Sequence, residues 1–283
     1  MKKIKFHEAI LLVLITLALF VWLAVFKLRV DKADIYFFDV GQGDSAMVVA
    51  PGNVEILIDG GPDNKVLSEI GKVMPFYDRK IELIILTHPH EDHLSGLIDV
   101  LKRYEVEEIW ETKITSEGET YKKWQEIIKE KNIPDIAIWS GRMKSFGNLK
   151  IETLAPLENL DGKNIENLNN SSIVNKVTFK NKTFLFTGDI EEGAQQDLVN
   201  SGQDLKSDIL KQPHHGSEKF LSSFLNKVSP QYVVVSCGLN NKFNFPNFKT
   251  LDKIKNAELF RTDLDKTLKF SIKNNELIFN TGL

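Results

Sequence analysis

The residues best suited to chemistry form one short run, Thr87-His88-Pro89-His90-Glu91-Asp92-His93, which holds three of the six histidines. His88 and His90 are two residues apart, so in an extended segment their imidazoles point the same way and can bind one cation. Asp92 and His93 lie further along and can reach a second cation. Imidazole and carboxylate ligands together suit zinc or manganese. The run therefore predicts a metal site, and the alternative is a polar loop that is rich in histidine by chance.

A second group of candidate ligands follows much later in the chain. Asp189 lies behind Gly188 at the end of an apolar segment, and His214 and His215 follow another. A carboxylate at a strand end can bridge two cations. Adjacent histidines tend to diverge, so we expect one of the pair to bind metal and the other to face substrate or a hydrogen-bond acceptor. A helix start capped by Ser217 is an ordinary alternative for this segment.

Apolar segments of strand length precede these polar groups. Residues 81–86 precede the histidine run, residues 183–186 precede Asp189, and residues 94–104 have the pattern of a helix. Such loops at the carboxyl ends of strands are where α/β folds usually place catalytic residues. Strands come first, and strands and helices then alternate, which predicts an α/β protein of two mixed sheets packed together with helices outside.

Aspartates also end two strands predicted near the N-terminus. Asp39 follows residues 35–38, Asp59 follows residues 54–58, and glycines lie next to both turns. Ordinary glycine turns of a β-meander would explain this pattern. Alternatively, the two carboxylates accept hydrogen bonds from metal-binding imidazoles.

The N-terminus has a separate character. Residues 9–26 carry no charged side chain, Lys2, Lys3 and Lys5 precede them, and Lys27 and Arg29 follow. About 20 apolar residues cross a bilayer, so we expect residues 1–30 to be a membrane anchor and residues 31–283 to be the catalytic domain. A cleaved signal peptide is the alternative, but its apolar region is usually shorter and ends at a small-residue site. The leading lysines favour a single-pass protein of the cell membrane with an extracytoplasmic domain, and the following basic residues oppose that orientation.

Overall charge gives no support for tight non-specific binding of nucleic acid. The formal net charge is −3, and the first 30 residues contribute five basic residues and one acid, so the remainder is more acidic still. Nucleic-acid binding usually shows as a positive face. A local basic groove stays possible, because net charge does not describe one surface.

Several motifs, taken in order, resemble one family. The histidine run, Thr187-Gly188-Asp189-Ile190 and Pro213-His214-His215-Gly216-Ser217 are similar to the metallo-β-lactamase superfamily. With Phe38-Asp39-Val40-Gly41-Gln42-Gly43-Asp44-Ser45 and Arg261-Thr262-Asp263 they resemble, more narrowly, the hydrolase domain of the ComEC-like competence group. The resemblance implies an αββα sandwich, preceded here by one transmembrane helix, and a hydrolase with two divalent ions, zinc or manganese.

The resemblance also implies roles for individual residues. His88 and His90 would hold one ion, whereas Asp92, His93 and one histidine of the later pair would hold the other, with Asp189 as the bridge. We expect His215 to be that ligand and His214 to face substrate, with Asp92 orienting a metal-activated hydroxide. The expected substrate is a phosphodiester, DNA or a related phosphoester. A cell-wall or small-molecule phosphoester, and a catalytically weak metal-bearing module that partners a separate DNA-uptake channel, are the alternatives.

The chain departs from the family pattern in three places. Many members supply another histidine between the positions of His93 and Asp189, but residues 169–172 of this chain are Asn-Asn-Ser-Ser. Phe245 stands where the group has histidine in an Asn…His-Pro loop, and Lys266 stands where glycine usually follows Arg-Thr-Asp. The first departure implies a more loosely held first ion. Together they put the identity of the substrate in question more than metal binding.

Overall fold

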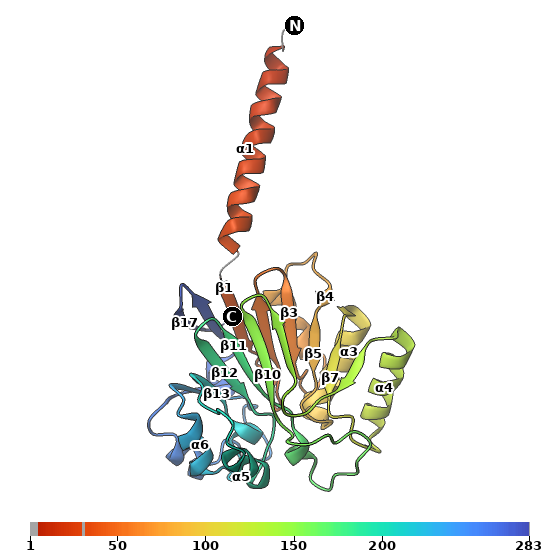
Figure 1. The fold of residues 1–283 in the computed structure, drawn as a ribbon, viewed down its shortest axis with the longest axis vertical. Helices are drawn as coiled ribbons and strands as arrows, with labels where there is room; N and C mark the ends of the chain where they lie inside the picture. The colour runs from red at the N-terminus through yellow and green to blue at the C-terminus, as the bar shows by residue number, and fades with distance from the viewer. Residues whose placement is uncertain (1–4, 30–31, 283) are drawn as a thin grey trace.

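Two mixed β-sheets packed face to face form the centre of the protein (Figure 1). The computed structural model describes residues 5–29 and 32–282. The first sheet has the order β17-β16-β1-β2-β3-β5-β7-β8. Its strands are β1 (Lys32–Phe37), β2 (Ala46–Ala50), β3 (Val54–Ile58), β5 (Leu83–Ile85), β7 (Ile109–Glu111), β8 (Asp135–Ala137), β16 (Leu268–Lys273) and β17 (Glu276–Thr281). The neighbours β3, β5, β7 and β8 run parallel, so their carboxyl ends share one edge.

The second sheet has the order β15-β14-β13-β12-β11-β10-β9. Its strands are β9 (Met143–Phe146), β10 (Leu149–Ala155), β11 (Val174–Phe179), β12 (Lys182–Phe186), β13 (Ile209–Lys211), β14 (Tyr232–Val235) and β15 (Glu258–Arg261). The strands from β12 to β15 are parallel, whereas those from β9 to β12 are antiparallel. A two-stranded sheet pairs β4 (Lys80–Ile81) with β6 (Glu105–Val106).

Helices cover the outer face of each sheet (Figure 1). On the first sheet lie α2 (Lys65–Val73), α3 (Glu91–Arg103) and α4 (Glu119–Lys131), and on the second lie α5 (Glu192–Asn200) and α6 (Ser222–Val228). Shorter elements are α7 (Phe248–Lys253), α8 (Thr262–Asp265) and the 3-10 turns η1 (Leu168–Ser171) and η2 (Pro213–Gly216). Apolar side chains of both sheets, such as Phe37 and Phe184, fill the space between the sheets. The predicted αββα sandwich is confirmed.

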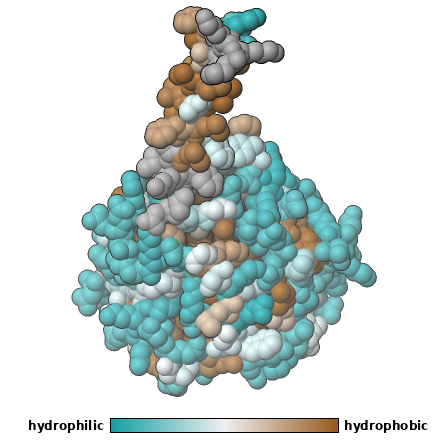
Figure 2. Space-filling view, turned by 45° about the horizontal axis from the view of Figure 1, so that its top comes forward, coloured by the Kyte–Doolittle hydropathy of each residue, from teal (hydrophilic) through white to brown (hydrophobic). Residues whose placement is uncertain are grey.

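The N-terminal helix α1 (Phe6–Arg29) stands apart from this sandwich (Figure 1). Its 18-residue window Phe6–Leu23 has a mean hydropathy of 2.3 and no residue buried inside the protein. Figure 2 shows this hydrophobic surface above a domain whose visible face is largely hydrophilic. At 1.5 Å per residue, its 24 residues can span a hydrocarbon core of about 30 Å. α1 is thus a candidate membrane-spanning helix by length and composition, and a signal sequence near an N-terminus would look the same.

Segment boundaries differ from the sequence predictions where polar residues take part in the architecture. The strand expected at residues 81–86 is split, because Ile81 pairs with β6 while Leu83–Ile85 joins the main sheet. The helix after the histidine run begins at Glu91, inside the run. Asp92 and His93 therefore lie on its first turn. Ser217 does not cap a helix, since it follows η2 and α6 begins only at Ser222.

Candidate metal centre

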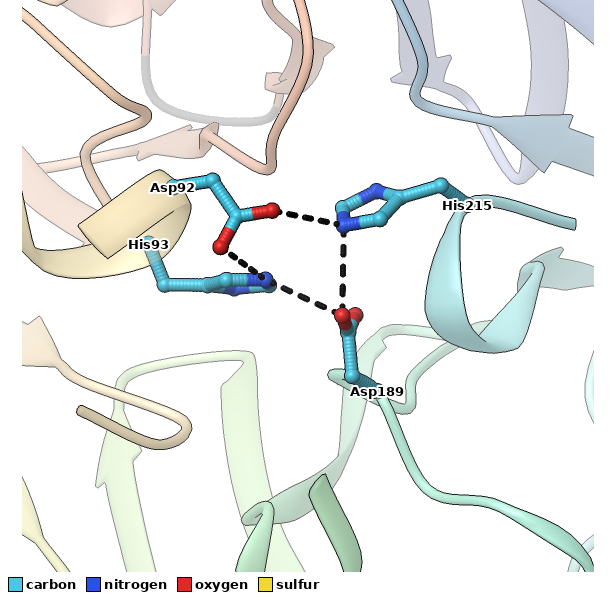
Figure 3. A group of neighbouring side chains, drawn as sticks. All are labelled: Asp92, His93, Asp189 and His215. Carbon is cyan, nitrogen blue, oxygen red and sulfur yellow. Dashed lines mark ion pairs between the residues drawn. The ribbon is translucent and has the colours of Figure 1, made fainter. Parts of the chain in front are cut away.

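The polar residues predicted from distant parts of the chain meet at the carboxyl ends of β5, β12 and β13. His88 and His90 lie in the loop after β5, and Asp92 and His93 follow on the first turn of α3. Asp189 follows β12, and His214 and His215 lie in η2 after β13. Parallel strands bring these ends to the same edge of the sandwich, so residues about a hundred positions apart face one another (Figure 3).

Four side chains are arranged as the ligands of one cation would be. Asp92, His93, Asp189 and His215 each offer one atom, and these atoms lie within 4.8 Å of one another (Figure 3). Oδ2 of Asp189 is 3.3 Å from Nε2 of His93 and 3.2 Å from Nε2 of His215. Oδ2 of Asp92 is also 3.2 Å from Nε2 of His215. Atoms that each bind zinc at about 2.0–2.2 Å lie about 3–4 Å apart, so the spacing fits a shared ion.

Buried atoms without hydrogen-bond partners test whether a cation belongs here. Among the described residues, Nε2 of His93, Nε2 of His215 and Oδ1 of Asp189 are buried and form no hydrogen bond. A buried polar atom without a partner costs about 1–3 kcal/mol. The two imidazole nitrogens face Oδ2 of Asp189, at 3.3 and 3.2 Å, whereas Oδ1 of Asp189 lies 3.5 Å from the ammonium of Lys211. A divalent cation would satisfy the two nitrogens together with Oδ2, because imidazole nitrogen and carboxylate oxygen are its usual ligands. The residues present therefore fit a metal ion.

His88 and His90 form the adjoining part of the centre. Nε2 of His88 and Nδ1 of His90 are 2.9 Å apart, so the two nitrogens lie next to each other. Nδ1 of His88 is turned away and contacts Oγ1 of Thr87 at 3.1 Å and Oγ of Ser172 at 3.3 Å. The ring of His88 lies 4.2 Å from that of His93, centroid to centroid. The pair could therefore hold a second ion beside the first, and Ser172, from the Asn-Asn-Ser-Ser stretch of residues 169–172, lies near this pair.

Hydrogen bonds to the Nδ1 atoms fix the orientation of the buried imidazoles of His93 and His215. The Nδ1–H of His93 donates to Oδ2 of Asp59 at 2.8 Å, which leaves Nε2 for the centre. Asp59 in turn accepts hydrogen bonds from the backbone N–H and the hydroxyl of Thr87, both at 2.8 Å. Nδ1 of His215 is held by the carbonyl of Ser236 at 2.9 Å. Asp39 has no such role, since its carboxylate accepts a hydrogen bond from Gly41 at the turn.

Two functional residues were missed by sequence reasoning. Asp44 and Lys211 are buried beside the centre, where they form an ion pair. The Lys211 ammonium also donates to the carbonyl of Gly188 at 3.0 Å and lies 3.5 Å from Oδ1 of Asp189. Asp44 lies 3.3 Å from Nδ1 of His215. The sequence signal for Asp44 was its place in the Gly-Gln-Gly-Asp motif. Lys211 lies on an otherwise apolar strand, and no sequence signal pointed to a role for it.

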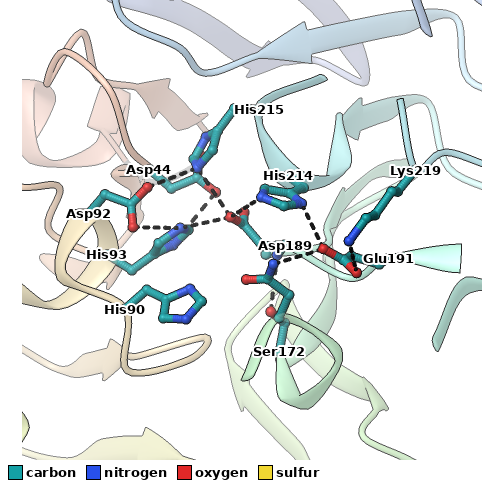
Figure 4. Close-up of polar contacts among 12 residues, drawn as sticks. Asp44, His90, Asp92, His93, Ser172, Asp189, Glu191, His214, His215 and Lys219 are labelled. Atoms are coloured by element: carbon teal, nitrogen blue, oxygen red, sulfur yellow. Dashed lines mark hydrogen bonds and ion pairs between the residues drawn. The ribbon is translucent and has the colours of Figure 1, made fainter. Parts of the chain in front are cut away.

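His214 faces the opposite side of Asp189 from His93 (Figure 4). Its Nε2 is 4.0 Å from Oδ2 of Asp189, and its Nδ1 is 3.4 Å from Oε1 of Glu191. Glu191 is itself fixed by Lys219 at 2.8 Å (Figure 4). The His214 side chain keeps 20% of its surface exposed, against 2% for His215. His215 therefore lies in the four-residue group and His214 at its solvent side, and the role of each stays a prediction.

The electrostatics of the centre favour cations. Burial alone would lower the pKa of His93, but the carboxylates of Asp189 and Asp59 outweigh burial and hold that pKa well above its ordinary value. The same competition, with Asp189 and Asp44 as the carboxylates, raises the pKa of His215. Burial lowers the pKa of His88 well below its ordinary value, and the nearby His93 adds to that effect. In the absence of metal, protons on the imidazoles of His93 and His215 would supply the positive charge that a cation would otherwise bring.

Comparison with known proteins places this centre in a family. Residues 39–238 match the model of the "Metallo-beta-lactamase superfamily". The chain is 27% identical over 265 residues to "ComE operon protein 3" of Bacillus subtilis, covering 86% of this chain and 34% of that protein. It is 28% identical over 250 residues to "Competence protein ComA" of Neisseria gonorrhoeae, covering 86% and 33%. The chain therefore spans about a third of the length of these relatives.

A solved structure shares the fold. The metallo-beta-lactamase fold protein YhfI from Bacillus subtilis superposes with a TM-score of 0.56 at 12% sequence identity, covering 88% of this chain and all of that one. A likeness at this identity shows the architecture only. The family match spans the edge of the sandwich where the imidazoles and carboxylates converge, from Asp39 to beyond His215. The chain belongs to the metallo-β-lactamase superfamily and has relatives among the competence proteins.

Proposed function

We propose that this protein is a metal-dependent hydrolase of phosphodiester bonds with a two-ion centre. The observation that carries the proposal is the group of Asp92, His93, Asp189 and His215, whose ligand atoms converge and whose two buried imidazole nitrogens lack hydrogen-bond partners. His88 and His90 would hold the first ion, the four-residue group the second, and Asp189 both. Zinc and manganese each suit these ligands. The proposal of DNA or a related phosphoester as substrate draws support from the competence relatives.

The chemistry divides between the ions and the chain. Bound divalent ions supply a Lewis acid for a phosphoryl oxygen and a source of hydroxide at neutral pH. Asp92 is the most exposed of the four ligands, with 31% of its side chain accessible, so one of its oxygens can accept a hydrogen bond from the attacking water. His214 lies at the solvent side with Glu191 next to its Nδ1, and its Nε2 can contact a substrate oxygen. Asp92 and His214 are therefore the proposed catalytic residues.

Residues 1–30 are the proposed membrane anchor, and residues 31–283 are the proposed hydrolase domain. The length and hydropathy of α1 support the anchor. Three lysines before it and two basic residues after it leave the orientation to experiment, and we propose a single-pass protein of the cell membrane with its domain outside. Accessibility of Cys237 does not report this orientation because the residue is buried. Protease treatment of intact cells and of inverted vesicles would do so.

The test is metal content and turnover of the full chain in detergent. Single-stranded DNA, duplex DNA and bis(p-nitrophenyl) phosphate are assayed with manganese or zinc. We expect two ions per chain and hydrolysis of the diesters. Cleavage of the small diester without cleavage of DNA would favour a small-molecule or cell-wall phosphoester as substrate. Bound metal without any turnover would contradict the hydrolase and favour a binding module that partners a DNA-uptake channel.

Asp189 offers the decisive variant. Asp189→Ala removes the carboxylate that lies between His93 and His215, so we expect the metal affinity to fall by at least about 100-fold and hydrolysis to be lost. The control is Asp99→Asn, a surface carboxylate on α3 that pairs only with Lys102 among the described residues. Circular dichroism checks that both variants are folded. Activity near the wild-type level in Asp189→Ala would refute the bridging role.

A further inference from the structure

A pair of phenylalanines stands next to the metal centre. The ring of Phe245 lies 5.5 Å from that of His214 and 6.4 Å from that of His215, centroid to centroid. Phe243 stacks on Phe245 with its centroid 5.5 Å away and an angle of 19° between the planes. The two rings thus form a continuous aromatic platform, Phe243–Phe245, that begins at the imidazoles and leads outward.

The loop that carries this platform is held in one conformation. The side chain of Asn241 donates to the carbonyls of Gly238 at 2.9 Å and Phe245 at 2.6 Å, and its carbonyl accepts from the backbone N–H of Phe245 at 2.9 Å. The loop also packs directly on η2, because a Cβ added to Gly216 would lie 2.5 Å from Cβ of Pro246. The rings are therefore presented in a fixed place relative to His214 and His215.

The outer ring of the platform is not part of the hydrophobic core. Phe243 is 50% exposed, although burial of a phenylalanine is ordinarily favourable. Nζ of the neighbouring Lys242 lies 5.0 Å from the centroid of the Phe243 ring. A half-exposed ring, a lysine ammonium lying over that ring and the proposed metal centre match the three parts of a nucleotide strand: a flat base, an anionic backbone and the diester to be cut. Because Phe245 stacks on the same ring, the flexible Lys242 side chain must move off it for a base to stack there.

We propose that Phe243 and Phe245 stack a base of a single-stranded nucleic acid whose neighbouring phosphodiester enters the metal centre. This inference rests on the proposed function and specifies its substrate class. In a duplex each base is already stacked and paired, so an isolated aromatic platform can reach only an unpaired base. Stacking tolerates any base because every base has a π face. The platform also accounts for Phe245 at a position where the related group has histidine.

Base removal gives the sharpest test. Fluorescent oligothymidylate and an abasic oligomer of equal length carry the same charge, so the ratio of their dissociation constants reports base stacking alone. We measure it by anisotropy with the full-length Asp189→Ala chain in detergent, in which turnover cannot interfere. Stacking of a base contributes a factor of between about five and a hundred in affinity. We expect oligothymidylate to bind more tightly than the abasic oligomer by a factor in that range.

Ring variants on this background assign the effect to the platform. Phe243→Ala should abolish the preference for the base-bearing oligomer, and Phe243→Trp should restore it. Phe76→Ala, which removes a ring that is 87% exposed on the loop after α2, should leave the preference unchanged. Equal binding of the two oligomers by the unmodified background, retention of the preference in Phe243→Ala, or tighter binding of duplex DNA would each overturn the inference.

The outcome can be separated from that of the proposed function. The binding ratio needs no catalysis, whereas the hydrolase is tested by metal content and turnover of the small diester. A base preference that depends on Phe243, without turnover by the wild-type chain, would support the platform and refute the hydrolase. Turnover of the small diester without any base preference would do the reverse.

Discussion

The buried Asp59 should decide which nitrogen of His93 carries a proton, and its replacement by asparagine tests that role. In the wild-type chain Oδ1 of Asp59 accepts from the backbone of Thr87 and Oδ2 accepts from Nδ1–H of His93, each at 2.8 Å. In Asp59→Asn the amide oxygen can keep the Thr87 contact, so the NH2 group must face His93. An NH2 group donates, and Nδ1 must then be the acceptor. The proton of the neutral imidazole moves to Nε2, which can no longer bind a cation.

The expected magnitude follows from this change of tautomer. Loss of an acceptor that orients a metal-binding histidine typically costs 10- to 100-fold in metal affinity. We expect the upper end, about 100-fold or 2.7 kcal/mol, because Asp59→Asn blocks the coordinating nitrogen and does not merely release it. The ion held with Asp92, Asp189 and His215 should weaken most. The ion held by His88 and His90 should weaken less, since Nδ1 of His88 keeps its contact with the hydroxyl of Ser172 even though the Thr87 hydroxyl loses its acceptor at Oδ2 of Asp59.

The assay is calorimetric titration of the metal-depleted full chain with zinc or manganese, with the bound ions counted by mass spectrometry. Asp39→Asn is the matched control, because Asp39 also follows a strand but its carboxylate contacts the turn at Gly41 and Lys65. It should bind both ions as the wild type does. Two ions bound by Asp59→Asn with wild-type affinities would show that Asp59 does not set the tautomer, and the reasoning would fail.

Two further predictions concern stability. Gly96→Ala should destabilise the domain by more than about 3 kcal/mol, since its Cβ would lie 2.0 Å from the carbonyl oxygen of Gly60, whereas Gly71→Ala in α2 meets nothing within 4 Å and should be neutral or stabilising by up to about 1 kcal/mol in chemical unfolding. Burial, with the nearby Asp135, raises the pKa of Glu111 from 4.5 to about 8. Between those values the folded state binds the proton and the unfolded state does not, so stability should fall as pH rises, by up to about 1.4 kcal/mol per unit. Glu111→Gln should remove that dependence in urea titrations from about pH 5 to 8, and parallel curves for both proteins would contradict it.

The structure brings together the residues that the sequence singled out, and their roles as ligands stay a prediction. The two-residue spacing of His88 and His90 is a local pattern, and apolar segments of strand length indicated that Asp189 and His215 follow strands. That these residues share one site with His93 was implied by the family resemblance. Periodicity did not predict the residues at which helices begin and strands end, because polar side chains take part in the structure at those positions. His90 precedes the first residue of α3, so part of the predicted loop became helix. Likewise Glu82, which accepts a backbone hydrogen bond from Glu55 at 2.7 Å, lies where a continuous strand was expected.

Some residues have a role that depends on contacts with segments far away in the chain, and sequence patterns do not predict those contacts. Asp59 and Asp39 looked equivalent, since each follows a strand next to glycine, but only Asp59 lies under the histidine loop. Lys211 ends a short strand after two consecutive apolar residues, and nothing in that pattern shows that its ammonium reaches the centre. Phe243 is one more aromatic residue in the sequence, and its significance comes from the ring it stacks on. Such roles arise from packing between segments that are remote in the chain.

Asp44, Asp59 and Lys211 affect the metal centre through their charges. Asp44, Asp59, Asp92 and Asp189 bring four carboxylates into one largely buried space, and Lys211 offsets one of them. Buried anions are tolerated only when a positive charge or a hydrogen bond compensates each of them. The ammonium of Lys211 is a permanent positive charge because it belongs to the chain. It pairs with Asp44, which is not one of the four residues Asp92, His93, Asp189 and His215. The remaining negative charge then lies on the side of Asp92 and Asp189, so we expect the pair of Asp44 and Lys211 to direct the proposed cations toward the four-residue group.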